Sequence, residues 1–216
     1  MLPVIYSMSV SLDGFIAGPT GDIGWTAPEG EQFRFHIEQT RHVAAHLCGR
    51  GLYQEMLVWE TAEQTMSDEA ELEFARIWRP IPKVVFSRTL TSVAGTARLA
   101  TDDIATEVGR LRDRPGEGVV AIGGAGLAAA AIAEDLIDDY RQFVNPVILG
   151  GGTPYFTPLA KPLDLRLIES RTCSSRVVYL GLPAHALSLA PRNTSASITS
   201  ASMWKGTVSQ RSKKFL

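Results

Sequence analysis

The chain has 216 residues, of which 45% are hydrophobic, and a formal net charge of -2. This length fits one domain, and the small charge argues against a protein that binds nucleic acid or a membrane surface by bulk electrostatics. No apolar run reaches the ~18 residues of a membrane-spanning helix. The N-terminus lacks the pattern of a signal peptide, so we expect a cytoplasmic protein. Cys48 and Cys173 lie far apart without metal-site spacing, which predicts reduced thiols and no metal centre.

Strands and helices are expected to alternate along the chain. The first part predicts a strand over 3–12, a glycine-rich loop over 13–25, a helix that begins near Glu29, a buried strand over 43–48, a short helix over 52–57, a helix from Asp68 to Trp78, a strand over 83–87 and a helix over 101–113 capped at Thr101. The second part predicts a strand over 119–123 that runs directly into a helix, a strand that begins at residue 139, and a closing hairpin of 163–170 with 176–182.

This order of elements predicts an α/β fold with three layers. Strands that alternate with helices form a mostly parallel central sheet covered on both faces, and the closing hairpin adds an antiparallel C-terminal edge. We therefore expect one domain over 1–182. Residues 183–216 are rich in Ser and Thr, with five basic and no acidic side chains and no sustained hydrophobic period. They are interpreted as a mobile tail.

The stretch 119-VVAIGGAGLAAAAIAEDL-136 places three glycines where a strand passes into a helix. They indicate either a tight turn or a phosphate site, because a helix N-terminus offers unpaired N–H groups to an anion. Gly124-x-Gly126-x-x-Ala129 also satisfies the dinucleotide fingerprint of a Rossmann unit. That unit requires an acidic residue about 20 positions on, at the end of the next strand, whereas Asp138 and Asp139 come too early and precede a strand.

Five segments carry a resemblance to a known family. VIYSMSVSLDGFIAGPTGDIGW, LCGRGLYQEM, KVVFSRTL, VVAIGGAGL and FVNPVILGGGTPYF occur in this order and span residues 3 to about 182. Together they resemble the dihydrofolate reductase-like family, in particular the branch that includes the reductase domain of bacterial riboflavin biosynthesis. The resemblance implies the same mostly parallel sheet with an antiparallel last strand, and NADPH as cofactor.

The resemblance also implies which residues bind NADPH. Those matching the family's pyrophosphate turn are Ile122, Gly123, Gly124, Ala125, Gly126 and Leu127. Those matching the loops around the adenosine 2′-phosphate are Gly49, Arg50, Gly51, Ser87, Arg88 and Thr89. Those matching positions beside the nicotinamide ring are Ser9, Ile16 and Ala17. Without the family motifs, Arg50 and Arg88 would be interpreted as solvated surface arginines.

On the substrate side the resemblance implies a mobile flap over residues 18–25. The residues implied to shape the substrate pocket are Trp25, Asn145, Pro146 and Gly151. Classical dihydrofolate reductases have a carboxylate about five residues after the flap tryptophan. Here that offset falls on Gly30, between the weak catalytic candidates Glu29 and Glu31. Acidic residues in the first turn of a helix more often interact only with its dipole. His36 and His42 are expected at the surface, and the proton donor stays open.

We therefore expect an NADPH-dependent reductase that transfers hydride to a small, heterocyclic substrate such as a pteridine or pyrimidine. Its partners would be this substrate and, in a homodimer, a second copy of the chain, but no nucleic acid or membrane. Two alternatives stay open. One is a non-catalytic nucleotide-binding or regulatory module on the same fold, which the missing carboxylate favours. The other is a different α/β enzyme with a short Rossmann unit and a preference for NADH, against which Arg50 and Arg88 argue.

Overall fold

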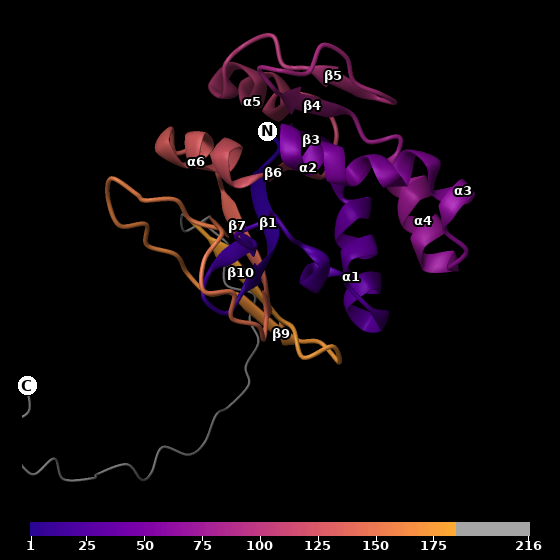
Figure 1. The fold of residues 1–216 in the computed structure, drawn as a ribbon. Coiled ribbons are helices and arrows are strands. Elements are labelled where there is room, and N and C mark those ends of the chain that lie inside the picture. Colours follow the sequence, from indigo (N-terminus) through magenta and orange to yellow (C-terminus); the bar gives the residue numbers. More distant parts are fainter. Residues whose placement is uncertain (185–216) are drawn as a thin grey trace, which may run out of the picture.

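The structure is a computed structural model that describes residues 1–184 (Figure 1). The tail expected to be mobile falls, from residue 185 onward, outside the described residues. The strands are β1 (Val4–Ser11), β2 (Phe15–Ala17), β3 (Val43–Gly49), β4 (Lys83–Phe86), β5 (Ala97–Leu99), β6 (Val119–Gly123), β7 (Asp139–Asn145), β8 (Thr153–Pro154), β9 (Glu169–Thr172) and β10 (Val178–Pro183). The helices are η1 (Gly24–Thr26), α1 (Gly30–Arg41), α2 (Arg50–Met56), η2 (Leu57–Thr61), α3 (Ala62–Thr65), α4 (Glu69–Trp78), α5 (Ile104–Arg112) and α6 (Ala125–Ala133).

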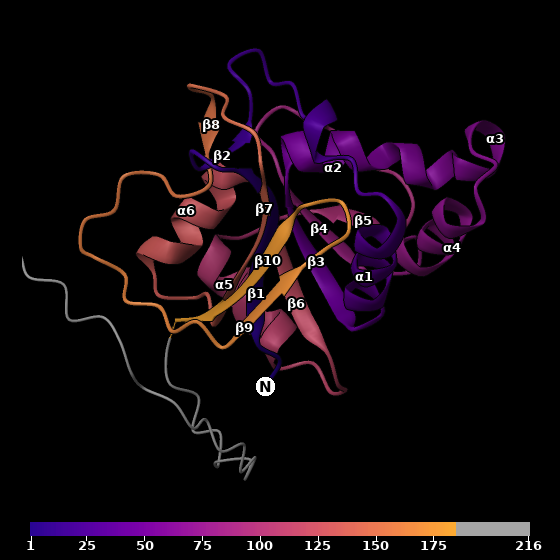
Figure 2. The same cartoon turned by 90° about the horizontal axis from the view of Figure 1, so that it is seen from below.

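Within the described part of the chain, the central sheet has the strand order β5-β4-β3-β6-β1-β7-β10-β9. Every neighbouring pair from β5 to β7 is parallel. β10 pairs antiparallel with β7 and with β9, so the edge is an antiparallel hairpin. The expected fold class is thus confirmed. β2 and β8 form a separate small sheet beside this one, which the sequence reading did not predict (Figure 2).

Helices cover both faces of the sheet (Figures 1 and 2). α1 and α4 pack together on one face through Ile37, Phe74 and Trp78. α5 and α6 lie on the other face, where Val108 and Ala128 join the largest core cluster. This three-layer arrangement buries both faces of the parallel strands, because each helix turns its apolar stripe toward the sheet.

Two predicted boundaries were wrong. α5 is capped by Asp103, whose Oδ1 accepts from the Thr106 N–H at 2.8 Å, and not by Thr101. The first strand of the hairpin is Glu169–Thr172 and not 163–170. Leu163 and Leu165 pack against the core, and the N–H groups of Arg166 and Ile168 donate to the carbonyls of Pro183 and Gly181, although this segment is not a regular strand.

The described residues contain no helix that is long and apolar enough to cross a membrane. Between residues 1 and 184 there is also no cluster of three or more His, Cys, Asp or Glu side chains that could hold a metal ion. Cys48 and Cys173 are both buried free thiols.

Candidate functional site

A cavity of about 860 Å³ opens at the carboxyl ends of the parallel strands. The chain runs from β3 outward to β4 and β5 and then returns to β6, which lies between β3 and β1. The strand order therefore reverses at the β3–β6 pair, and such a switch point is where open α/β sheets bind ligands. The cavity is lined by Met8, Ile16, Ala17, Gly21, Ile23, Gly49, Arg50, Gly51, Leu52, Glu55, Phe86, Ser87, Arg88, Thr89, Ala100, Thr101, Asp102, Gly124, Ala125, Gly126, Leu127, Ala130 and Thr153.

The glycine turn after β6 places the N-terminus of α6 against this cavity. Gly124 is the N-cap residue, with φ 99° and ψ 124°, and no side chain caps the helix. The first intrahelical bond runs from the Ala128 N–H to the Gly124 carbonyl at 2.9 Å. The N–H groups of Ala125, Gly126 and Leu127 precede it, and those of a first turn have no intrahelical acceptor. This turn is therefore suited to hold an anion.

The turns after β3 and β6 lie in contact with each other, and at Gly124 the positive φ of 99° also favours glycine. A Cβ added at Gly124 would lie 3.5 Å from the Gly49 Cα, and one at Gly49 would lie 3.6 Å from the Gly123 carbonyl oxygen. At Gly51 and Gly126, by contrast, an added Cβ would have no described atom within 4 Å. The first pair keeps the two turns together, whereas the second pair leaves open space next to the helix N-termini.

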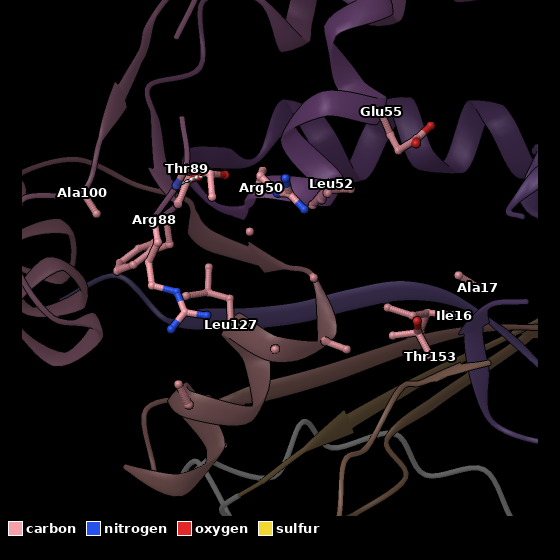
Figure 3. Close-up of a pocket in the computed structure, with 18 of the residues that line it drawn as sticks. Ile16, Ala17, Arg50, Leu52, Glu55, Arg88, Thr89, Ala100, Leu127 and Thr153 are labelled. Atoms are coloured by element: carbon pink, nitrogen blue, oxygen red, sulfur yellow. Dashed lines mark hydrogen bonds between the residues drawn. The ribbon is translucent and has the colours of Figure 1, made fainter. Parts of the chain in front are cut away.

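Two arginines lie at one end of the cavity. Figure 3 shows Arg50, at the start of α2, and Arg88, in the loop after β4, at the same end as Thr89. Ser87 Oγ shapes this loop by accepting from the N–H groups of Thr89 and Leu90, at 3.2 and 3.0 Å. Among residues 1–184 neither arginine forms an ion pair with a carboxylate. Both guanidinium groups are therefore available to an anionic ligand.

Asp102, which the sequence reading did not single out, also lines the cavity. Its Oδ2 accepts from Arg110 Nη1 at 2.6 Å and from Thr101 Oγ1 at 2.9 Å. The hydrogen bond from Arg110 is the largest cause that lowers the pKa of Asp102. The carboxylate is thus ionised but paired. No sequence signal could have identified Asp102, because it follows a short strand and aspartate is common at the start of any helix.

The opposite end of the cavity is mostly apolar. Figure 3 places Ile16, Ala17 and Thr153 away from the arginines, on the side of the view where Glu55 of α2, another lining residue, also lies. Ile16 and Ala17 belong to β2, and Ala17 pairs with Thr153 of β8. Met8 of β1 also lines the cavity. The side chains suit a flat, uncharged ring.

Most residues implied to bind the cofactor lie together in the cavity lining, but three do not. Ser9 follows Met8 on β1, and because successive side chains of a strand point to opposite faces, Ser9 points away from the cavity that Met8 lines. Ile122 is a core residue with 1% exposure. Gly123 is covered by α2, since a Cβ there would lie 2.1 Å from Leu52 Cδ2. These two support the turn from beneath.

The residues implied to shape the substrate pocket also lie outside this lining. The Trp25 Nε1–H donates to the Asp22 carbonyl at 3.2 Å within the flap. Asn145 is buried, and its Nδ2 donates to the carbonyl of Phe143 at 2.9 Å. Pro146 is exposed, and a Cβ at Gly151 would lie 3.9 Å from Pro19 Cγ.

Neither catalytic candidate reaches the cavity. Glu29 is the exposed N-cap residue of α1, and its side chain makes no capping bond. Glu31 forms an ion pair with Arg171 of β9, whose hydrogen bond is the largest cause that lowers the pKa of Glu31. This pairing ties α1 to the edge of the sheet.

The expectation of a surface position was wrong for His36. Its ring stacks on Phe143 with 4.0 Å between centroids, and burial lowers its pKa to about 4. Its Nε2 is buried and has no hydrogen-bond partner among the described residues. His42 is exposed as expected, with Nε2 3.5 Å from Glu38 Oε1.

Comparisons with known proteins agree with this architecture. Residues 3–179 match the model of the RibD C-terminal domain family. The protein YyaP of Bacillus subtilis is 30% identical over 179 residues, which cover 82% of this chain and 92% of YyaP. YwjB of the same organism is 30% identical over 165 residues, 76% of this chain and 87% of YwjB.

Solved structures share the fold at lower identity. A protein from Shewanella sp. PV-4, provisionally assigned to riboflavin biosynthesis, has a TM-score of 0.67 at 22% identity, over 86% of this chain and 99% of its own. A diaminohydroxyphosphoribosylaminopyrimidine deaminase/5-amino-6-(5-phosphoribosylamino)uracil reductase from Thermotoga maritima has a TM-score of 0.60 at 18% identity, over 85% of this chain and 57% of its own. The family match spans nearly all of the described residues, and the chain belongs to the RibD C-terminal domain family.

Proposed function

We propose that the protein is an NADPH-dependent reductase that transfers hydride to a small, heterocyclic substrate of the pteridine or pyrimidine class. The observation that carries the proposal is the layout of the cavity. An uncapped helix N-terminus lies between an end with two arginines and an apolar end. A dinucleotide with a 2′-phosphate has its groups in the same order: the 2′-phosphate for the arginines, the pyrophosphate for the helix N-terminus and the nicotinamide ring for the apolar end.

The residues present fit this cofactor. The N–H groups at the start of α6 would hold the pyrophosphate, and the open space at Gly51 and Gly126 leaves room for its oxygens. Arg50 and Arg88 would bind the 2′-phosphate, since charge-assisted hydrogen bonds from guanidinium groups suit phosphate oxygens. When bound, NADPH supplies the hydride.

The contribution of the chain is then alignment and exclusion of water. Met8, Ile16 and Ala17 would hold the nicotinamide ring against an apolar wall. Gly21 and Ile23 of the flap also line the cavity and would cover this end from solvent. Such a site accelerates hydride transfer mainly by aligning the nicotinamide ring, the hydride donor, with the substrate atom that accepts the hydride.

The substrate class rests on the family and not on a contact. The chain belongs to the RibD C-terminal domain family, and one protein of the same fold is a uracil reductase by name. A non-catalytic module on this fold is the second candidate, because Glu29 and Glu31 both lie outside the cavity. Turnover separates the two functions.

The test has two parts. NADPH and NADH are titrated against the protein, and oxidation of the bound cofactor is then followed with a panel of pterins, pyrimidine ribosylamines and quinones. We expect tighter binding of NADPH than of NADH and oxidation with at least one acceptor. Binding without oxidation by any acceptor would favour the module. Binding of neither dinucleotide would contradict the proposal.

A further inference from the structure

Asp13 connects two loops that are far apart in the sequence. It lies in the turn between β1 and β2. Its Oδ1 accepts from the Leu149 N–H at 3.1 Å, and its Oδ2 accepts from the Gly150 N–H at 2.7 Å, 137 residues away. Ser11 Oγ donates to the same carboxylate at 2.7 Å and is the largest cause that lowers the pKa of Asp13. The ionised carboxylate therefore receives donors from both loops.

Further bonds fasten the same loops along their length. Ser11 Oγ accepts from the Phe15 N–H at 2.9 Å, which fixes the first residue of β2. The Leu12 N–H donates to the Val147 carbonyl at 2.8 Å, and the Tyr155 N–H donates to the Gly14 carbonyl at 2.9 Å. The turn before β2 and the segment before β8 thus form one hydrogen-bonded unit centred on Asp13.

This unit places the glycine turn 150–152 directly against β2. Gly152 has φ 130°, and a Cβ there would lie 2.0 Å from the Ala17 carbonyl oxygen. The next residue, Thr153, pairs with Ala17, and both line the apolar end of the cavity. Gly18, the first residue of the flap, follows Ala17. Its N–H donates to the Asp22 carbonyl at 2.8 Å and closes the base of the flap. A shift of the glycine turn would therefore move both the wall and the base of the flap.

We propose that Asp13 is a positioning residue for hydride transfer: by holding the turn 149–152 against Ala17, it sets where the nicotinamide ring lies and leaves binding of the adenosine half to other residues. The inference rests on the proposed function. Asp13 is itself outside the cavity lining, so it acts through Ala17 and Thr153. The groups assigned to the adenosine half come from the loops after β3, β4 and β6, which Asp13 does not contact. A displacement of about 1 Å at the reacting ring is enough to slow a transfer strongly.

The test compares NADPH with 2′,5′-ADP, which has the adenosine half but no nicotinamide. In Asp13→Ala we expect the affinity for 2′,5′-ADP to stay within about twofold of the parent's. The affinity for NADPH should fall about tenfold, because the variant loses the contribution of the nicotinamide half. The enhancement of nicotinamide fluorescence on binding should fall with it. Asp13→Asn keeps one acceptor oxygen for the loop N–H groups and should restore part of both readouts.

A pair of glycine variants provides a matched control. Gly150 and Gly152 both have positive φ, at 73° and 130°, so alanine strains the backbone at each. Only at Gly152 would the new Cβ meet Ala17, because at Gly150 it has no described atom within 4 Å. Gly152→Ala should therefore reproduce the effect of Asp13→Ala on NADPH and on nicotinamide fluorescence. Gly150→Ala strains the backbone of the same turn without a clash with Ala17, so its effect on both readouts should be clearly smaller than that of Gly152→Ala. Thermal melting of each variant reports how much fold is retained.

The outcomes separate the inference from the proposed function. If the parent binds neither NADPH nor 2′,5′-ADP, the proposed function fails and the inference with it. If the parent binds both but Asp13→Ala keeps the parent's NADPH affinity and fluorescence, the positioning role alone is overturned. It is also overturned if Asp13→Ala weakens both ligands equally, because the residue would then support the fold as a whole.

Discussion

The glycines around the cavity differ in the atoms that an added side chain would contact. Because of this difference, a substitution at Gly126 can test the anion site without straining the backbone. Gly124 is a poor choice, because its φ of 99° would strain any variant with a side chain. Gly126, in the first turn of α6, has open space beside it and no positive φ. A side chain there enters the proposed pyrophosphate site without disturbing the turn.

We predict that Gly126→Asp weakens NADPH and NADH alike, by about tenfold or more, because the new carboxylate repels the pyrophosphate. The fold should be at least as stable as the parent's. An acidic residue in a first helical turn contributes about 0.3–1 kcal/mol, and aspartate is not a poorer helix former than glycine. Isothermal titration and thermal melting check the two halves. Gly126→Asn adds a side chain of the same size as aspartate without its charge, so it separates the effect of charge from that of bulk. Parent-like binding by Gly126→Asp would show that the pyrophosphate lies elsewhere.

The ion pair of Asp102 with Arg110 predicts an indirect effect on cofactor preference. Arg110 neutralises a carboxylate that lines the same cavity as Arg50 and Arg88. Removing it in Arg110→Met should weaken NADPH by about two- to fivefold at low salt, with little effect on NADH, since both side chains are partly exposed and screened. Asp102→Asn should cancel the effect when combined with Arg110→Met. Equal loss for both dinucleotides in Arg110→Met would show that the pair only shapes the loop.

At the scale of elements, α1 packs on the sheet through a histidine that must stay neutral. Burial holds the pKa of His36 at about 4, below the ~6.5 of an unfolded chain. Between these values the unfolded state binds more protons, so stability falls as the pH drops from about 6.5 to about 4.

His36→Phe keeps the stacking on Phe143 and removes the titration. We therefore predict that the free energy of unfolding of this variant exceeds that of the parent by a margin that grows as pH falls, up to about 3 kcal/mol near pH 4. Denaturant unfolding at several pH values measures this margin. His46 and the carboxylates titrate in both proteins and cancel in the difference. A margin independent of pH would contradict the buried, neutral state of His36.

Element type was predictable from the sequence, whereas several boundaries were not. Strong periodicity and a stop signal located the helix from Asp68 to Trp78 within one residue. Thr101 and Asp103 are both N-cap residue types, and only the tertiary path decides which one begins α5. β2, β5 and β8 have two or three residues each, too few for a recognisable alternation. The small β2–β8 sheet forms because Asp13 and the glycine turn bring distant segments together.

At the scale of the whole molecule, the cavity lining could be predicted only in part. The glycine turn and Arg50 and Arg88 were found because they match a family pattern and follow predicted parallel strands, whose ends meet at one edge of the sheet. Ser9 was predicted to face the cofactor, but its neighbour Met8 lines the cavity instead. A shift of one residue along a strand exchanges the two faces of the sheet, and the sequence did not determine this shift. His36 was misplaced because its ring stacks on Phe143 of β7, a contact that the periodicity of α1 does not indicate. The order of strands, which decides these contacts, is not visible in local patterns.

On the proposed function, one cavity binds NADPH and Arg50 and Arg88 hold its 2′-phosphate. The most direct measurement is the affinity of NADPH and NADH for the parent, the two single alanine variants and Arg50→Ala/Arg88→Ala. Each single change should weaken NADPH about tenfold and leave NADH nearly untouched, because only NADPH carries the group that these side chains would bind. The double variant should lose most of the preference. A double variant that still prefers NADPH as strongly as the parent would contradict the placement of the adenosine end.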